Sequence, residues 1–244
     1  MIFQFFNISI FQYFNFSIFQ FFNISILKVW TEEHWPLVIQ LYQKKPAGIK
    51  PMYSRDSVKL ALELHIPPQT IYQKMFQLRQ PQLPSLKQLM ERYAHNSRRL
   101  NTDCKRIRQM SGMGNASAFY DDVAVNETWE LDFKPINAQT AQLAGQPLLT
   151  PVMLIMILDL YFRLIPATMV AATPDVKEVA RLLDITPDDV VDVLGVFQYC
   201  DPFIRHDDIF IDPLFTPCQK IWQRYANDDP TILSNMAHQL QAYF

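Results

Sequence analysis

The sequence predicts a mainly α-helical protein built from two folded units. Apolar residues recur at three- and four-residue spacing through much of residues 30–110 and 149–244, which is the period of an amphipathic helix. The 17 prolines separate these segments and, with only five glycines, favour rigid connections. Charge divides the chain in the same way: residues 28–110 carry 15 Lys and Arg against 6 Asp and Glu, while residues 111–244 carry 7 against 18. We therefore expect a basic helical unit joined to an acidic one.

Composition places the boundaries between these units. Three of the five glycines, Gly112, Gly114 and Gly145, fall in one stretch between the basic and acidic segments. Glycine-rich stretches favour loops over regular structure. The predicted segments are a low-complexity repeat over 1–27, a basic domain over 28–110, a linker with one strand over 111–148, and an acidic domain over 149–244.

The first segment is a short repeat without charge. Residues 2–25 contain an eight-residue unit three times, IFQFFNIS, IFQYFNFS and IFQFFNIS. It lacks the basic start of a signal peptide, and its regular Gln and Asn residues do not suit a membrane span. We interpret it as a translated tandem DNA repeat, with a native start near Lys28–Trp30 and no packed structure. The alternative is a β-prone aggregation or anchoring segment.

Three helices are predicted at the start of the basic domain. The first follows Thr31, a good capping residue, and ends before Pro46. The second covers about 54–65. After the Pro67–Pro68 turn, the third covers about 68–79, with Ile71, Met75 and Leu78 facing inward.

The second and third helices contain a small residue where two helices would cross and three apolar positions after it: Ala61, Leu64, Ile66 and Ile71. This spacing resembles the helix-turn-helix superfamily. His65 replaces the usual turn glycine, whose backbone is left-handed, and His is one of the residue types enriched in that conformation. The start, Trp30-Thr31-Glu32-Glu33, resembles Myb/SANT-type three-helix domains, and the resemblance covers about residues 30–80.

This resemblance implies that the third helix enters the major groove of duplex DNA. Gln can pair with adenine, and Lys and Arg can bind guanine or phosphate. The DNA-binding residues expected on this helix are Gln69, Thr70, Tyr72, Gln73, Lys74, Gln77 and Arg79. The alternative is a solvated face of a helical bundle that binds no nucleic acid.

A second group of cations follows the third helix. An amphipathic helix is expected around Leu86 and Tyr93, and a basic stretch comes directly after it. We expect five cations of this stretch to bind backbone phosphate: Arg98, Arg99, Lys105, Arg106 and Arg108. A solvated basic face is again the alternative.

The linker contains a pattern similar to that of metal-dependent nucleases. Residues 126–133 favour a strand, on which Glu130, Asp132 and Lys134 would face one side. With Asp121 or Asp122 they resemble the D…(D/E)xK layout, whose carboxylates bind Mg²⁺. Short patterns of this kind arise often by chance, so we favour an ordinary strand or loop with exposed charges.

The acidic domain begins with the most apolar run of the chain, over 150–164. It is short for a membrane span, so we expect a buried core helix or an oligomer interface. Asp159 and Arg163, four residues apart, are expected to pair. Two closing helices are expected near the C-terminal end, around Trp222 and Leu233.

A second unit between these helices resembles a winged helix, over about residues 174–212. Four of its positions match the first unit at an offset of 119, with Asp184 at the position of His65: Ala180, Leu183, Ile185 and Val190. A short hairpin, 203–205 with 209–211, would form the wing. Aspartates on its second helix and wing would repel phosphate, so dimerisation or binding of a protein partner is the expected role: Asp188, Asp189, Asp192, Asp207 and Asp208.

Together these features predict a cytoplasmic DNA-binding protein of transcription-regulator type. The alternatives are a helical protein–protein adaptor that binds no nucleic acid, and the metal-dependent nuclease. The sequence lacks GxSxG, P-loop and HExxH motifs, so an enzyme is not favoured. Three cysteines without a CxxC pair favour ordinary thiols over a zinc site at Cys200, His206 and Cys218. We expect no cofactor, no bound metal and no membrane partner.

Overall fold

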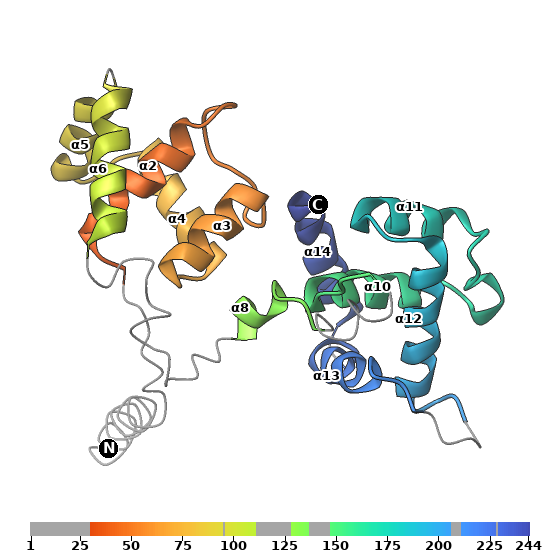
Figure 1. Ribbon diagram of the computed structural model, residues 1–244. Coiled ribbons are helices and arrows are strands. Elements are labelled where there is room, and N and C mark those ends of the chain that lie inside the picture. The colour runs from red at the N-terminus through yellow and green to blue at the C-terminus, as the bar shows by residue number, and fades with distance from the viewer. Residues whose placement is uncertain (1–29, 95, 111–127, 137–146, 206–210, 228) are drawn as a thin grey trace, which may run out of the picture.

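The computed structural model describes residues 30–94, 96–110, 128–136, 147–205, 211–227 and 229–244. Within these ranges it contains eleven α-helices, three short 3₁₀ helices and no strand, so the prediction of a mainly α protein is confirmed. The repeat over 1–27 lies outside the described residues, and so does most of the predicted linker. Figure 1 shows two groups of helices with one short helix between them.

The first group of helices follows the predicted order. The 3₁₀ helix η1 (Glu32–His34) leads into α2 (Trp35–Gln43), which is followed by α3 (Arg55–Leu64) and α4 (Pro68–Arg79). A helical hairpin then follows, made of α5 (Pro84–Ala94) and α6 (Ser97–Gln109). Helix α2 packs against α3, α4 and α6, so it is the central helix of this group. Its core contains the residues predicted to face inward on α4, which are Ile71, Met75 and Leu78.

The turn between α3 and α4 is built on a left-handed residue. His65 has φ +54° and ψ +37°, as its position in the sequence pattern predicted. The amide of Ile66 donates to the carbonyl of Ala61 at 3.0 Å, and the amide of His65 donates to that of Leu62 at 3.4 Å. These two bonds form a Schellman motif, which satisfies the last carbonyls of α3 and turns the chain into α4.

The second group is built around α10 (Pro151–Arg163). Seven consecutive residues of this helix, 152–158, are buried. Packed around it are four helices: α11 (Pro174–Leu183), α12 (Pro187–Cys200), α13 (Phe215–Tyr225) and α14 (Pro230–Leu240). The short helices η2 (Pro166–Thr168) and η3 (Gln241–Tyr243) complete this group. The predicted helix over 150–164 is thus confirmed as a core helix, and no helix in the described ranges has the length and apolar character needed to cross a membrane.

The turn between α11 and α12 repeats the geometry of the first turn. Asp184 has φ +58° and ψ +42°, and the amide of Ile185 donates to the carbonyl of Ala180 at 3.1 Å. These residues lie 119 positions after His65, Ile66 and Ala61, the offset found in the sequence. The two units therefore share one way of joining two helices, while the residue in the left-handed position differs in charge and size.

The strand predicted in the linker is wrong. Residues 128–132 form the short helix α8, which lies between the two groups of helices (Figure 1). Trp129 packs against the core of the first group, and Phe133 and Ile136 pack against the core of the second. These apolar contacts with the two cores favour a helix, although Thr, Trp and Phe have a local preference for strands.

The predicted hairpin is not formed in the described residues. Residues 203–205 belong to a turn in which Asp201 accepts from the amide of Phe203 at 2.9 Å and from that of Ile204 at 3.2 Å. An Asp followed by Pro202 favours such a turn because its side chain satisfies the backbone locally. Residues 206–210, which include most of the second predicted strand, lie outside the described residues.

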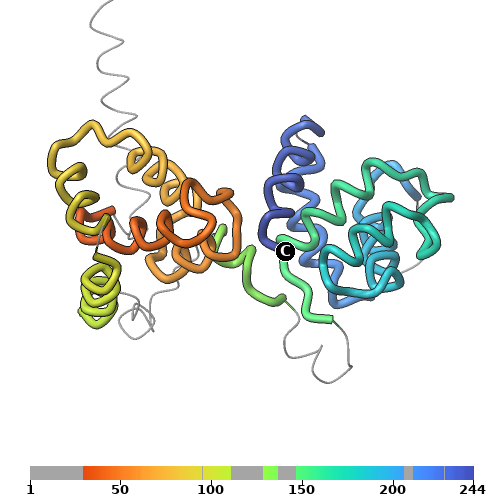
Figure 2. The backbone as a smooth tube through the Cα atoms, turned by 90° about the horizontal axis from the view of Figure 1, so that it is seen from above, coloured from red at the N-terminus to blue at the C-terminus, as the bar shows by residue number. Residues whose placement is uncertain are grey.

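The two groups also contact each other directly. The guanidinium of Arg55, at the start of α3, donates to the main-chain oxygens of Tyr243 and Phe244 at 2.7 and 2.8 Å. Tyr53 and Val58 belong to the same core as α10, although they precede and begin α3. Figure 2 shows the C-terminal end of the chain close to this part of the first group.

Candidate nucleic-acid interface

Helix α4 presents a polar, uncharged face to solvent. Its buried side is formed by residues at three- and four-residue spacing, Ile71, Met75 and Leu78. The opposite side contains four exposed residues of the helix and the exposed residue that caps its C-terminal end: Gln69, Gln73, Phe76, Gln77 and Gln80. The three glutamines predicted to face outward on this helix are therefore all exposed.

Lys74, in contrast, points toward the tryptophans of the first helices. Its Nζ lies 4.6 Å from the centroid of the Trp30 ring and 5.3 Å from that of Trp35. Both distances are those of a cation–π interaction, which favours this position of the ammonium group. Lys74 is half-buried, so the positive charge of α4 that remains fully exposed is Arg79, in the last turn.

Tyr72 is not an exposed residue of the outer face of α4, but it supports Phe76, which lies on that face. Its side chain is half-buried against the core of the first group, and its ring meets that of Phe76 edge-on, at 5.0 Å between centroids. Phe76 is 46% exposed. The prediction of site residues did not include Phe76, although its spacing from Gln73 places it on the same face.

Helix α6 supplies the second group of cations. Its N-terminal end is capped by Asn96, whose side chain accepts from the amide of Arg99 at 2.9 Å. Leu100, Cys104 and Ile107 face the core, so all five predicted cations lie on the remaining, exposed part of the helix. Burial raises the pKa of the Cys104 thiol to about 11, as expected for an inert structural cysteine.

The five cations differ in whether they already have a partner. Arg98, Lys105 and Arg106 make no ion pair or hydrogen bond through their side chains in the described part of the chain. Arg99 approaches Asp103 at 4.0 Å, but Asp103 also accepts a 2.8 Å hydrogen bond from Tyr93 of α5. The guanidinium of Arg99 is more than half exposed and is held weakly.

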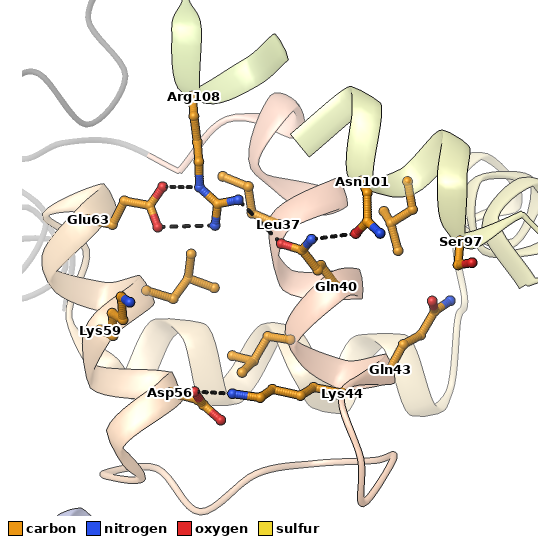
Figure 3. Close-up of a pocket in the computed structure, with 13 residues that line it drawn as sticks. Leu37, Gln40, Gln43, Lys44, Asp56, Lys59, Glu63, Ser97, Asn101 and Arg108 are labelled. Carbon is orange, nitrogen blue, oxygen red and sulfur yellow. Dashed lines mark hydrogen bonds and ion pairs between the residues drawn. The ribbon is translucent and has the colours of Figure 1, made fainter. Parts of the chain in front are cut away.

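Arg108 joins α6 to α3, although its side chain is still partly exposed. Its guanidinium donates to both carboxylate oxygens of Glu63, at 2.5 and 3.2 Å, and to the side chain of Gln40 at 3.4 Å (Figure 3). The hydrogen bond with Glu63 raises the pKa of Arg108. Arg108 also lines a pocket of about 480 Å³ between α2, α3 and α6, in which Lys44 is paired with Asp56 at 2.5 Å. Two of the three cations that line this pocket, Lys44 and Arg108, are thus paired with carboxylates within the fold.

The two sets of predicted DNA-binding residues lie on two helices that both pack against α2. In the described part of the chain, α4 and α6 each contact α2 more than they contact one another. Within α6, Arg98 and Lys105 are seven residues apart and share one side, while Arg99 and Arg106 share another.

A contact that the sequence did not indicate holds the turn before α4. Nδ1 of His65 lies 2.9 Å from Oε1 of Glu130, on helix α8. The Glu130 side chain is 5% exposed, and it is one of the carboxylates of the predicted nuclease pattern. The sequence predicted the left-handed backbone of His65, but it did not predict the contact of its side chain with Glu130, 65 residues away.

The carboxylates of the nuclease pattern are engaged in separate structural contacts. Asp132 accepts two hydrogen bonds from the guanidinium of Arg224, at 2.7 and 2.8 Å, while Glu130 contacts His65. On a helix, residues two apart do not share a face, unlike on the predicted strand. Asp121 and Asp122 lie outside the described residues, and no group of metal-binding side chains is present among the described ones. His206 of the zinc alternative also lies outside them.

Helix α12 of the second unit presents acidic residues to solvent, whereas the outer face of α4 in the first unit is uncharged. Desolvation, together with Asp189, Asp188 and Asp212, raises the pKa of Asp192. Asp189 caps α12 by accepting from the amide and hydroxyl of Thr186, at 2.9 and 2.6 Å. The predicted pair of Asp159 and Arg163 is present at 3.1 Å.

The chain was compared with protein-family models, with curated proteins and with solved structures, and none of them matches it.

Proposed function

We propose that this protein binds duplex DNA through its first group of helices, and that it acts as a regulator of transcription. The observation that carries the proposal is the outer face of α4. This helix follows a left-handed turn at His65, and it presents Gln69, Gln73 and Gln77 to solvent with no acidic side chain between Leu64 and Met90. Such a face suits the major groove, where side-chain amides pair with base edges.

The electrostatics support the same proposal. Arg79, Arg98, Lys105 and Arg106 are exposed and have no partner among the described residues, so binding phosphate would not require breaking an existing ion pair. Release of counterions from DNA would make their contribution strongly dependent on salt. We assign base contacts to α4, whose exposed face carries glutamines, and contacts with backbone phosphate to α6, whose exposed face carries cations.

We further propose that the second group of helices is a winged-helix-like unit that dimerises or binds a protein partner. The turn at Asp184 between α11 and α12 supports the resemblance to a winged helix, because it repeats the turn at His65 between α3 and α4. Its role as a second DNA reader is disfavoured by Asp188 and Asp192, whose charges already repel each other within the fold.

The test is a series of electrophoretic mobility shifts with the full chain and duplex DNA at increasing KCl. We expect binding at about 50 mM salt that weakens steeply toward about 200 mM. Replacing Arg98 and Arg106 together by Ala should lower the slope of log K against log[salt] by about 2, one for each phosphate that is no longer neutralised. The matched control replaces Lys177 and Arg181, two exposed cations of α11, and should leave the slope unchanged. Absence of binding at low salt would favour the adaptor alternative.

A further inference from the structure

The outer face of α4 has an unusual combination of side chains for a helix of a basic domain. It contains three exposed glutamines and an exposed phenylalanine, and no Lys or Arg at its centre. The one lysine within the helix, Lys74, is held over the Trp30 and Trp35 rings. The contact that most often specifies guanine, a bidentate Arg or Lys, is therefore missing from this face.

Each remaining side chain of this face has a preferred base. The amide of Gln pairs bidentately with N6 and N7 of adenine, and an apolar group such as Phe packs on the 5-methyl group of thymine. Gln73 and Phe76 are three residues apart on the helix, so they can meet neighbouring base pairs. Nothing on this face selects guanine or cytosine.

Phe76 is also held in position before any ligand binds. Its ring is set edge-on against Tyr72, which is itself half-buried against the core. An exposed aromatic ring gains free energy when an apolar group covers it, and a fixed ring loses little conformational entropy on binding. With 46% of its surface exposed, Phe76 has room for such a contact.

We infer that α4 selects A·T-rich duplex DNA, with Gln73 pairing to adenine and Phe76 packing on a thymine methyl group. This inference rests on the proposed DNA-binding function and adds to it the class of sequence and the residues that specify it. Gln69 and Gln77 extend the same chemistry by one turn in either direction.

The first experiment selects bound duplexes from a random pool with the full chain. We expect enrichment of A·T-rich sites containing adjacent adenine and thymine. Gln73→Ala should relax selection at one base pair, where the native discrimination is expected to be about tenfold. Gln223→Ala is the matched control, because Gln223 is an exposed glutamine of α13 in the second group of helices, and it should leave the selected sequence unchanged.

The second experiment removes the methyl group from the DNA. Replacing the selected thymine by deoxyuracil should weaken binding of the unmodified protein about fourfold, the factor expected for one buried methyl group. The same replacement should have no effect on Phe76→Ala, and Phe76→Leu should keep part of the penalty. Thermal unfolding of each variant checks that this exposed substitution leaves the fold intact.

The outcomes separate the inference from the proposed function. Selection of G·C-rich sites, or a deoxyuracil penalty that persists in Phe76→Ala, overturns the inference while DNA binding stands. Tighter binding of single-stranded than of duplex DNA also overturns it, since Phe76 would then be a platform for base stacking. Absence of salt-sensitive binding to any nucleic acid overturns the proposed function and the inference with it.

Discussion

The imidazole of His65 and the buried carboxylate of Glu130 lie 2.9 Å apart, although 65 residues separate them in the sequence. His65 has two roles, because it is also the left-handed residue that ends α3. A glycine would suit the backbone of this turn better, but it could not contact Glu130. The sequence therefore departs from the usual turn glycine at a position where the side chain makes a long-range contact.

His65→Gly is expected to destabilise the protein. The substitution relieves the left-handed backbone but leaves the Glu130 carboxylate buried without its partner, at a net cost of about 1–2 kcal/mol. Urea denaturation measures this change. The control is Asp184→Gly, at the same backbone conformation but exposed and without a side-chain partner among the described residues, which should be neutral or stabilising by up to about 1 kcal/mol. Equal effects of the two substitutions would show that the Glu130 contact contributes nothing.

The pair of Asp132 and Arg224 should contribute to stability through both of its hydrogen bonds. Asp132→Asn is expected to cost about 2 kcal/mol, as for hydrogen bonds to charged groups that are mostly shielded from water. In the Arg224→Met background the same change should cost much less, because the partner is already absent. Lys134→Gln, an exposed neighbour, is the control.

Asp132→Asn also tests the nuclease alternative directly. Because Asp132 is occupied by Arg224, we expect no Mg²⁺-dependent cleavage of DNA by the unmodified chain. Cleavage that disappears in Asp132→Asn, with folding retained, would establish the nuclease and contradict our assignment.

The acidic surface of the second unit should make stability depend on pH. The raised pKa of Asp192 means that the folded state holds its proton more tightly than the unfolded state. This stabilising contribution is complete below the ordinary Asp pKa of about 3.9 and is lost as pH rises through the raised value. Asp192→Asn should therefore be more stable than the unmodified protein near pH 7, and this difference should shrink toward pH 3 and at high salt.

The control for Asp192→Asn is Glu178→Gln, which removes one negative charge from an exposed position on a different helix, α11. Thermal unfolding at several pH values measures both variants. A gain of Asp192→Asn that stays constant from pH 3 to pH 7 would show that charge is not its cause.

Two arginines of α6 provide a matched pair. Arg106→Gln should weaken DNA binding and lower the salt slope by about 1, with stability unchanged, because Arg106 has no partner in the described part of the chain. Arg108→Gln should instead cost about 1–2 kcal/mol of stability, since Glu63 loses two hydrogen bonds. Both substitutions remove one positive charge, so identical effects on DNA binding would mean that net charge alone matters.

Elements with strong local signals could be predicted from the sequence. Helix α4 begins at Pro68 and ends at Arg79 as expected, because Pro67 and Pro68 set its start and the apolar spacing sets its inner face. The left-handed residues His65 and Asp184 were also indicated, since they occupy the same position in two matching patterns. These features depend on residues a few positions apart, so no knowledge of the tertiary structure is needed.

The errors concern residues whose environment is made by distant parts of the chain. The segment over 126–133 has local preference for a strand, but the burial of Trp129 and Phe133 in different cores favours a short helix. The assignment of Lys74 and Arg108 to DNA binding stays a prediction, but their contacts with Trp30 and Glu63 could not be predicted from the sequence either. A single sequence contains no signal for such partners, which lie about 45 residues away along the chain.

Helix α8 has a thermodynamic consequence for the whole molecule. It contacts the turn before α4 through Glu130 and the second group of helices through Asp132. If DNA binding displaced His65 from Glu130 and thereby altered the contact of Asp132, the second group would bind any partner with a different affinity. By reciprocity, that partner would change the affinity for DNA by the same factor. The short segment between the two groups would then make the affinity of each group depend on whether the other has bound its ligand.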